Sequence, residues 1–231
     1  MKLGVIGAYG KMGKQVVALA SQDKSIEFTL DLITKKGAEE KILPSLDMII
    51  DFSTKEALFE NLSLAHKINC PIVIGTTGFD EKEKKNLLEA AKNIPIFWAP
   101  NFSLGMASLL YVTKILSSCL QNFTSHIEET HHTQKKDAPS GSALALKLAI
   151  EQGNPHNSPS IESFRVGDVI GDHTVFFNSE EENITLSHQA ISRSVFAKGA
   201  LAAAKFLANQ KPGLYGMDDL LPYLIQKSQR S

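Results

Sequence analysis

The first residues of the chain place a strand, a glycine-rich turn and a helix in direct succession. Residues 3–6 are an apolar run that predicts a buried strand, residues 7–13 carry a glycine at every third position, and residues 14–21 favour a helix. Dinucleotide-binding folds require this order, because the turn lets the backbone approach a pyrophosphate at the helix start. The spacing is G-x-x-G-x-x-G, with Tyr9 at the usual place of the middle glycine. A tight turn without a ligand fits the same pattern, but we expect cofactor contacts from Gly7, Ala8, Tyr9, Gly10, Lys11, Met12 and Gly13.

Strands and helices continue to alternate through the first half of the chain. Apolar runs at 26–33, 46–50, 71–74 and 94–98 predict four more strands, and residues 55–68 and 81–92 predict helices. This alternation favours an α/β fold with a Rossmann-like doubly wound parallel sheet. Ligands of such sheets bind beyond the carboxyl ends of the strands. Two of these strands are followed by segments that either are plain loops or contact the cofactor, namely Gly75, Thr76 and Thr77, and Ala99, Pro100, Asn101 and Phe102.

The end of the second predicted strand bears on the choice of cofactor. NAD-binding folds usually have an acidic residue there, which accepts hydrogen bonds from the adenosine ribose. Here Thr34, Lys35 and Lys36 follow the strand, and Asp31 lies two residues inside it. A lysine near the ribose favours an additional phosphate, although a solvated turn gives the same sequence. We therefore expect NADPH as the cofactor, with contact from Lys35 and with NADH as an alternative.

The segment 131–142 combines several groups that can take part in catalysis or in anion binding. His131 and His132 stand side by side, and Lys135 follows four residues after the first of them. Pro139 and Ser140 are typical of a helix start and precede a strong helix former at 143–150. The backbone N–H groups of Gly141 and Ser142 would then point forward from the positive helix end, which binds carboxylate or phosphate. A helix with a purely structural role would need only the capping serine. The additional lysine and two imidazoles beside the helix start therefore predict an anion site.

The second half of the chain changes its pattern. A strand at 127–130 leads to His131, and strands at 161–166, 173–177 and 183–191 follow with short connections, which suggests an antiparallel or mixed open sheet. A helix of small residues at 201–208 and a last helix at 217–226 indicate a return to the first domain after Arg193. We expect residues 1–102 with 194–231 to bind the dinucleotide. Residues 103–193 would form an α+β domain for substrate binding and oligomerisation.

Composition excludes some classes of partner. The formal net charge is -1, so a general nucleic-acid or membrane-surface binder is not expected. Cys70 and Cys119 lack the spacing of a metal site and suit a reducing cytoplasm. No apolar run approaches the length of a membrane-spanning helix.

The segment 131–142 also resembles the signature of a known family. His-His-x-x-Lys-x-Asp-Ala-Pro-Ser-Gly-Ser is similar to the motif of the dihydrodipicolinate reductases, also called 4-hydroxy-tetrahydrodipicolinate reductases. Further likeness runs from residue 7 to the last predicted helix, with Gly75-Thr-Thr-Gly-Phe-Asp80, Asn101-Phe-Ser103 and Arg165-x-Gly-Asp-x-x-Gly-x-His173 as its most specific parts. The chain departs from the family at Thr133-Gln134, where relatives often carry Arg and His, and this thins the positive charge around the site.

The resemblance implies an activity and residue roles. It implies NAD(P)H-dependent reduction of 4-hydroxy-tetrahydrodipicolinate, a small dicarboxylate, with loss of water in diaminopimelate and lysine biosynthesis. His131 would donate the proton, and Lys135 would bind the substrate and take part in proton chemistry. His132 and the backbone of Gly141 and Ser142 would contact the substrate carboxylates. The loops at 75–77 and 99–102 would contact the nicotinamide half of the cofactor. Four sheets of the second domain would pack together in a homotetramer.

Three other interpretations compete with this one. Another two-domain oxidoreductase could act on a different small acid, but the double histidine with Lys135 at the fourth place argues against it. A sensor that binds NAD(P) without turnover would not need the imidazole pair beside an anion site. Zinc binding by His131 and His132 is disfavoured, because adjacent histidines diverge in an extended segment and no cysteine or carboxylate has matching spacing. We therefore expect no metal.

Overall fold

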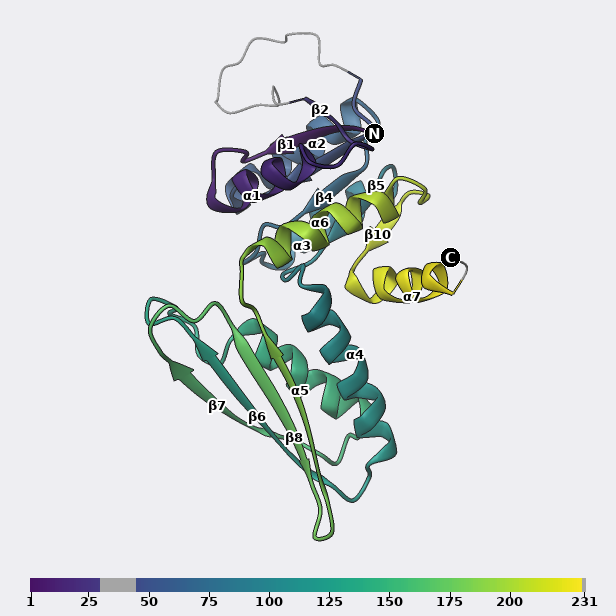
Figure 1. Cartoon of the computed structure of the whole chain (residues 1–231). Helices are drawn as coiled ribbons and strands as arrows, with labels where there is room; N and C mark the ends of the chain where they lie inside the picture. The colour runs from purple at the N-terminus through teal and green to yellow at the C-terminus, as the bar shows by residue number, and fades with distance from the viewer. Residues whose placement is uncertain (30–44, 230–231) are drawn as a thin grey trace. The chain divides into compact units, whose positions relative to one another are not determined.

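The computed structural model describes residues 1–29 and 45–229 (Figure 1). The chain forms two compact units, one made of Met1–Ser103 with Ser194–Ser231 and the other of Leu104–Arg193. The boundaries expected from the sequence are 1–102 with 194–231, and 103–193. Lys35, which is expected to contact the cofactor, lies outside the described residues. The same holds for Asp31, Thr34 and Lys36, on which the expected cofactor preference depends.

The first unit contains a six-stranded sheet in the order β10-β5-β4-β3-β1-β2. All five neighbouring pairs are parallel. The strands are β1 (Lys2–Ile6), β2 (Glu27–Thr29), β3 (Met48–Asp51), β4 (Ile72–Ile74), β5 (Pro95–Trp98) and β10 (Gly213–Tyr215). Because β1 lies between β2 and β3, the direction of winding reverses beside β1, and its carboxyl end is the topological switch point at which such sheets bind ligands.

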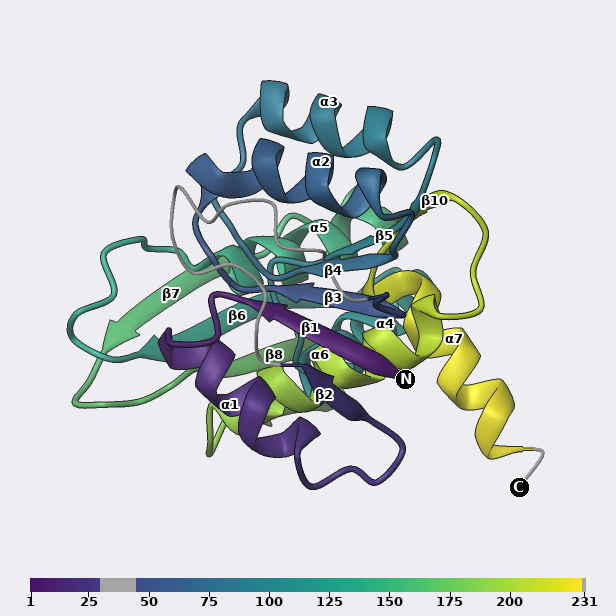
Figure 2. The same ribbon diagram turned by 90° about the horizontal axis from the view of Figure 1, so that it is seen from above.

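Helices cover both faces of this sheet (Figure 2). On one face lie α1 (Lys11–Ala20) and α6 (Ser194–Leu207), which contact each other; on the other lie α2 (Leu58–Lys67), preceded by the 3-10 turn η1 (Lys55–Ala57), and α3 (Glu81–Ala90). The last helix is α7 (Met217–Ser228). Strands buried on both sides explain the continuous apolar runs in the sequence, since Met48, Ile49 and Ile50 are all fully buried. The expected doubly wound parallel sheet is confirmed.

Two elements of this unit differ from the sequence prediction. Helix α6 begins at Ser194, although its run of small residues predicts a helix only from residue 201. Val195, Phe196 and Gly199 are weak helix formers, but close packing outweighs that preference: a Cβ at Gly199 would lie 1.7 Å from the carbonyl oxygen of Phe102. Strand β10 is not expected from the sequence, because three residues after a proline carry no strand pattern and only pairing with β5 makes them a strand.

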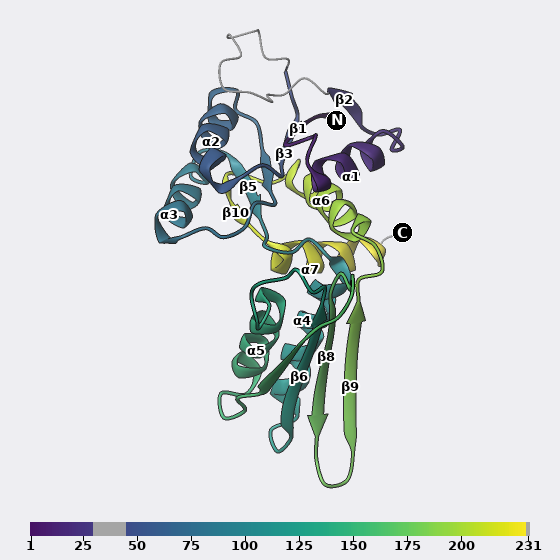
Figure 3. The same ribbon diagram turned by 90° about the vertical axis from the view of Figure 1, so that its left-hand side faces the viewer.

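The second unit contains a four-stranded sheet in the order β7-β6-β8-β9. Its strands are β6 (Thr124–His131), β7 (Ser160–Arg165), β8 (Asp172–Asn178) and β9 (Asn183–Gln189). The pair β6–β7 is parallel and the other two pairs are antiparallel, so the sheet is mixed. Helices α4 (Leu104–Cys119) and α5 (Gly141–Gly153) cover one face (Figure 3). Their apolar residues form a core with three strand residues, Ile127, Val175 and Phe177.

The opposite face of this sheet is open within the unit. Side chains along β9 alternate between exposed and partly buried, and most of β7 is exposed. This is the pattern expected of an open mixed sheet. No helix among the described residues is long and apolar enough to cross a membrane.

Candidate active site

The register of the second sheet brings four polar side chains together at one end. On β6, the buried residues Ile127, Glu129 and His131 are two positions apart, so their side chains share one face of the strand. Strand β8 pairs His173 with Glu129, and β7 pairs Arg165 with His131. Strand β6 and the later strands β7 and β8 therefore contribute to one cluster.

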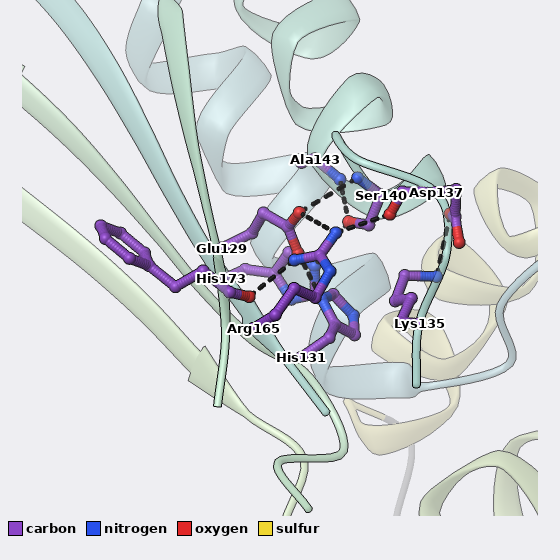
Figure 4. A network of polar contacts seen from close by, with 9 residues as sticks. Glu129, His131, Lys135, Asp137, Ser140, Ala143, Arg165 and His173 are labelled. Carbon is purple, nitrogen blue, oxygen red and sulfur yellow. Dashed lines mark hydrogen bonds and ion pairs between the residues drawn. The ribbon is translucent and has the colours of Figure 1, made fainter. Parts of the chain in front are cut away.

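The carboxylate of Glu129 is the centre of this cluster (Figure 4). Its Oε2 accepts a hydrogen bond from Nδ1 of His131, and its Oε1 accepts from Nη2 of Arg165 at 2.9 Å and from the backbone N–H of Ser140 at 3.2 Å. Glu129 is only 1% exposed. Burial alone would raise the pKa of this carboxyl, but the hydrogen bonds from Arg165 and its other partners hold the pKa below its usual value. The cluster therefore contains a buried, ionised carboxylate.

His131 is the last residue of β6 and is almost fully buried. With Nδ1 directed at Glu129, its other nitrogen, Nε2, lies beside Gly171, where an added Cβ would come within 3.0 Å. Burial lowers the pKa of His131, the carboxylate of Glu129 opposes this effect, and the charges of Lys135 and Arg165 lower the pKa further. Because an acceptor faces Nδ1, the neutral ring carries its proton there.

A second buried imidazole packs against the first. The rings of His131 and His173 meet edge to face with centroids 5.1 Å apart, and Nε2 of His173 lies 3.4 Å from Oγ of Ser140. Burial, followed by the charge of His131, lowers the pKa of His173 to about 4. His173 is therefore neutral at physiological pH, and the site avoids two adjacent positive imidazoles.

The loop after β6 carries the predicted lysine. Nζ of Lys135 forms an ion pair with Oδ2 of Asp137 at 2.9 Å, and Nη2 of Arg165 donates to the carbonyl oxygen of Asp137. Lys135 is close enough to His131 to influence its pKa. The structure thus brings His131 and Lys135 into one electrostatic cluster, and the partly buried His132 follows directly after the strand.

The same cluster reaches the start of α5. Ser140 is the N-cap, and its Oγ accepts a hydrogen bond from the backbone N–H of Ala143, as the sequence predicts. Gly141 and Ser142 form the first helical positions. A Cβ added at Gly141 would meet no atom of the described residues within 4 Å. The hydrogen bond from the Ser140 N–H to Glu129 therefore fixes the position of the helix start, while the next residue, Gly141, is exposed.

In the first unit, the N-terminal glycine turn is tightly built. Gly7 has φ +78°, and an added Cβ would lie 2.6 Å from the carbonyl oxygen of Phe52. A Cβ at Gly13 would lie 2.1 Å from the carbonyl oxygen of Gly7, so α1 packs against the turn as closely as a dinucleotide loop requires. The remaining predicted residues of this turn follow in order, with Tyr9 and Lys11 exposed, Met12 partly buried and Ala8 buried.

The other predicted cofactor residues lie at the carboxyl ends of β4 and β5. A Cβ at Gly75 would lie 2.1 Å from the ring of Phe52, so a larger residue there would have to displace that ring. Oγ1 of Thr76 is buried and has no hydrogen-bond partner in the described part of the chain. Thr77 and Pro100 are exposed and Asn101 is partly buried, whereas Ala99 is buried. The ring of Phe102 packs inward against Phe52 and Phe97, with centroids 5.8 and 5.7 Å away. The glycine turn and the unpaired Thr76 hydroxyl fit a dinucleotide.

Sequence reasoning missed two buried carboxylates. In the sequence Glu129 is only one residue of a predicted strand, although a carboxylate two residues from Ile127 and two from His131 must share their buried face. Asp51 at the end of β3 was also missed. It is fully buried and accepts hydrogen bonds from the Ser53 backbone and from Asn61 Nδ2, both at 2.8 Å, while burial raises its pKa.

The donor atoms of Glu129, His131 and His173 lie close enough together for a metal ion to be considered. Both oxygens of Glu129, however, already bind Arg165, Ser140 and His131. The cluster is better described as an internally paired polar network than as a metal centre.

Comparisons with known proteins point to one family. A family model described as "Dihydrodipicolinate reductase, N-terminus" matches residues 1–102, and one described as "Dihydrodipicolinate reductase, C-terminus" matches residues 105–221. Three curated proteins named 4-hydroxy-tetrahydrodipicolinate reductase are similar over 96% of this chain. They come from Bdellovibrio bacteriovorus (38% identical, 96% of its length), Caldanaerobacter subterraneus (40%, 98%) and Thermosipho africanus (41%, 98%).

Solved structures show the same fold. A dipicolinate-bound dihydrodipicolinate reductase from Paenisporosarcina superposes with a TM-score of 0.80 at 22% identity, covering 95% of this chain and 98% of that one. A diaminopimelate dehydrogenase from Corynebacterium glutamicum gives 0.59 at 12% identity, covering 97% of this chain and 95% of that one.

The neutral state of His173 predicts a pH-dependent stability. A histidine with a folded pKa near 4 and an unfolded pKa near 6.5 takes up its proton only on unfolding, so stability is lost as pH falls below about 6.5. We expect His173 to account for roughly 2 kcal/mol of the loss between about pH 7.5 and 5. His173→Asn should remove this part of the pH dependence, measured by urea unfolding at both pH values. His156→Asn, at an exposed loop position, is the control and should keep it. An unchanged slope in His173→Asn would mean that another group titrates.

Proposed function

Since the chain belongs to the dihydrodipicolinate reductase family, we propose that it reduces 4-hydroxy-tetrahydrodipicolinate to tetrahydrodipicolinate with loss of water, and that His131 supplies the proton. It is a nicotinamide-dependent oxidoreductase of diaminopimelate and lysine biosynthesis, as both matched family models and the names of its relatives indicate. The observation that supports the role of His131 is its ring, oriented by a buried carboxylate at one end of the sheet.

The residues of the second unit fit the proposed chemistry. Loss of water from the ring leaves a conjugated imine, and hydride addition leaves an enamine-like anion that must be protonated at a neighbouring carbon. The nicotinamide, when bound, supplies the hydride. Nε2 of His131 delivers the proton as a general acid. Burial holds the pKa of this imidazole low in the free protein, and the two carboxylates of the bound substrate would favour the protonated ring again.

A dianionic substrate also needs positive groups. Lys135 supplies an ammonium, and the start of α5 supplies backbone N–H groups at Gly141 and Ser142, where the helix dipole favours an anion. We propose that these groups and His132 bind the two carboxylates. Lys135 would exchange its partner Asp137 for the substrate, because the Asp137 side chain is 60% exposed and water weakens its ion pair with Lys135.

We further propose which residues bind the cofactor. The pyrophosphate would lie on the turn from Gly7 to Gly13, and the loops with Gly75, Thr76 and Thr77 and from Ala99 to Phe102 would contact the nicotinamide half. The close-packed glycines and the buried hydroxyl of Thr76 support this proposal. NADPH is proposed to serve at least as well as NADH, from the sequence around Lys35.

The family resemblance also supports a homotetramer in the cytoplasm. We propose that four copies associate through the open face of the second sheet, where Phe164 on β7 is 43% exposed. Cys70 and Cys119 are both free, which suits a reducing compartment.

Replacing the proposed acid should lower turnover. His131→Gln keeps polarity and approximate size but has no ionisable proton, and a positioned general acid contributes about 10² to 10⁴ in rate. We expect kcat to fall by that factor, while the affinities for substrate and NADPH change far less. Wild-type kcat should decline as pH rises through the imidazole pKa, and the variant should lack that decline. His66→Gln on α2 is the control. A variant with wild-type kcat, measured where hydride transfer or protonation limits the rate, would show that His131 is not the acid.

The anion site can be blocked without disturbing the chain. Because a Cβ at Gly141 meets no atom within 4 Å in the part of the chain that the structure describes, Gly141→Ala and Gly141→Val should fold normally. We expect KM for the substrate to rise modestly with alanine and by about tenfold or more with valine, equivalent to about 1.4 kcal/mol of binding. NADPH affinity, measured by fluorescence titration, should stay unchanged. Equal losses of both affinities would contradict an anion site at this helix start.

Cofactor preference can be tested at Lys35. A glutamate there would repel a ribose phosphate and could accept hydrogen bonds from a ribose hydroxyl. Lys35→Glu should therefore reduce kcat/KM for NADPH and raise the NADH to NADPH ratio. The matched charge reversal Lys211→Glu, at an exposed position of the first unit, should leave the ratio unchanged. If Lys35→Glu shows wild-type kinetics with both cofactors, Lys35 does not contact the ribose.

A further inference from the structure

We infer that Glu129 is a positioning residue for proton delivery, and that it fixes the imidazole of His131 so that Nε2 is the nitrogen that carries the transferred proton. This inference rests on the proposed role of His131. It adds a residue that does not itself touch the substrate, together with Arg165, which holds it in place.

The surroundings of Glu129 show that its charge is built into the fold. A buried carboxylate without partners is strongly unfavourable. An apolar residue at position 129, like Ile127 on the same face of β6, would therefore stabilise the core better than an unpaired glutamate. The chain instead surrounds the Glu129 carboxylate with three donors, from β6, from β7 and from the loop before α5. The orientation of the Arg165 guanidinium is also fixed by a hydrogen bond, because its Nη1 donates to the carbonyl oxygen of Phe164 at 2.6 Å.

An oriented carboxylate has two effects on the imidazole. It accepts the Nδ1 proton, which fixes both the ring plane and the tautomer and leaves Nε2 as the site that gains and loses a proton. It also stabilises the protonated ring. Burial and the charges of Lys135 and Arg165 act in the opposite direction on the pKa of His131, and Glu129 is the group that raises it.

The other titratable groups around the ring do not replace Glu129. His173 on β8 is neutral and lies beyond the edge of the His131 ring, and His188 on β9 faces His173 with centroids 6.3 Å apart. Asp137 in the loop is paired with Lys135. Among the described residues around His131, the carboxylate that bonds to its ring is therefore that of Glu129.

Glu129 also connects proton delivery to substrate binding. The oxygen that binds Arg165 also accepts from the backbone N–H of Ser140, the N-cap of α5. The proposed carboxylate site begins at the next residue, Gly141. One carboxylate therefore holds both the imidazole and the helix start in place, and the acid and the anion site keep a fixed spacing.

The test compares Glu129→Gln with Glu151→Gln. Glutamine keeps the size of Glu129 but removes its charge and can present an N–H to Nδ1, which favours the wrong tautomer. We expect kcat to fall about 10-fold or more, because a carboxylate that orients a catalytic histidine can contribute up to about 10⁴ in rate, with KM changed much less. The alkaline decline of kcat should move to lower pH, because the protonated ring has lost its stabilising charge. Glu151, which pairs with Lys147 on α5, should tolerate the same change.

Further variants and measurements separate positioning from folding. Glu129→Asp keeps the charge and should recover part of the kcat and the wild-type pH decline. Arg165→Lys keeps Glu129 ionised and should lower kcat without moving that decline. In ¹⁵N spectra of the imidazole, the wild type should show the proton of neutral His131 on Nδ1, and Glu129→Gln should show a mixture of tautomers. Titration with dipicolinate checks that each variant still binds a dicarboxylate.

Several outcomes would overturn the inference. Glu129→Gln could keep wild-type kcat and pH profile while His131→Gln loses activity; Glu129 would then be structural, and the proposed function would stand. The same tautomer in both proteins, or a parallel loss of dipicolinate binding, thermal stability and kcat, would also assign Glu129 to folding. Wild-type activity in His131→Gln would remove the proposed role of His131 as proton donor, and the inference with it, while the proposed reductase activity would stand.

Discussion

The second unit depends on one buried ionised carboxylate. Glu129 is solvated by the protein itself, since Arg165, His131 and the backbone of Ser140 take the place of water around its two oxygens. A charge in such a position is tolerated only when all its partners are present. Because its partners come from the end of β6, from β7 and from the N-cap of α5, Glu129 links these three elements. The proposed proton donor and the proposed anion site are therefore both held by hydrogen bonds to one carboxylate.

The same network sets the charge state of the cluster. Two imidazoles, a guanidinium and an ammonium lie near each other, and burial keeps His173 neutral. The cluster therefore holds positive charge at Arg165 and Lys135 and leaves His131 able to change its protonation state. An enzyme that must bind a dianion and also deliver a proton needs this separation between permanent cations and a titratable acid.

The first unit follows a different constraint, which is the close approach of backbone to backbone. A Cβ at Gly7 would meet the backbone of Phe52, and a Cβ at Gly13, in the first turn of α1, would meet the backbone of Gly7. Gly75, directly after β4, instead packs against the ring of Phe52. Such loops present N–H groups and a narrow surface, which suits a flat, charged dinucleotide. The buried hydroxyl of Thr76 belongs to the same edge of the sheet.

The sequence by itself determined the alternation of strands and helices, the glycine turn, the cap at Ser140 and the family. These features are local: apolar periodicity, glycine spacing and a capping serine act within a few residues, and a twelve-residue motif from His131 to Ser142 is specific enough to identify relatives. The early start of α6, the edge strand β10 and the role of Glu129 were decided only by the tertiary structure. Gly199 is helical because it packs on Phe102, β10 is a strand because β5 lies beside it, and Glu129 is ionised because the sheet register delivers Arg165 from a distant strand. Contacts between residues far apart in the chain leave no periodic trace in the sequence, so they become visible only when the strands are paired.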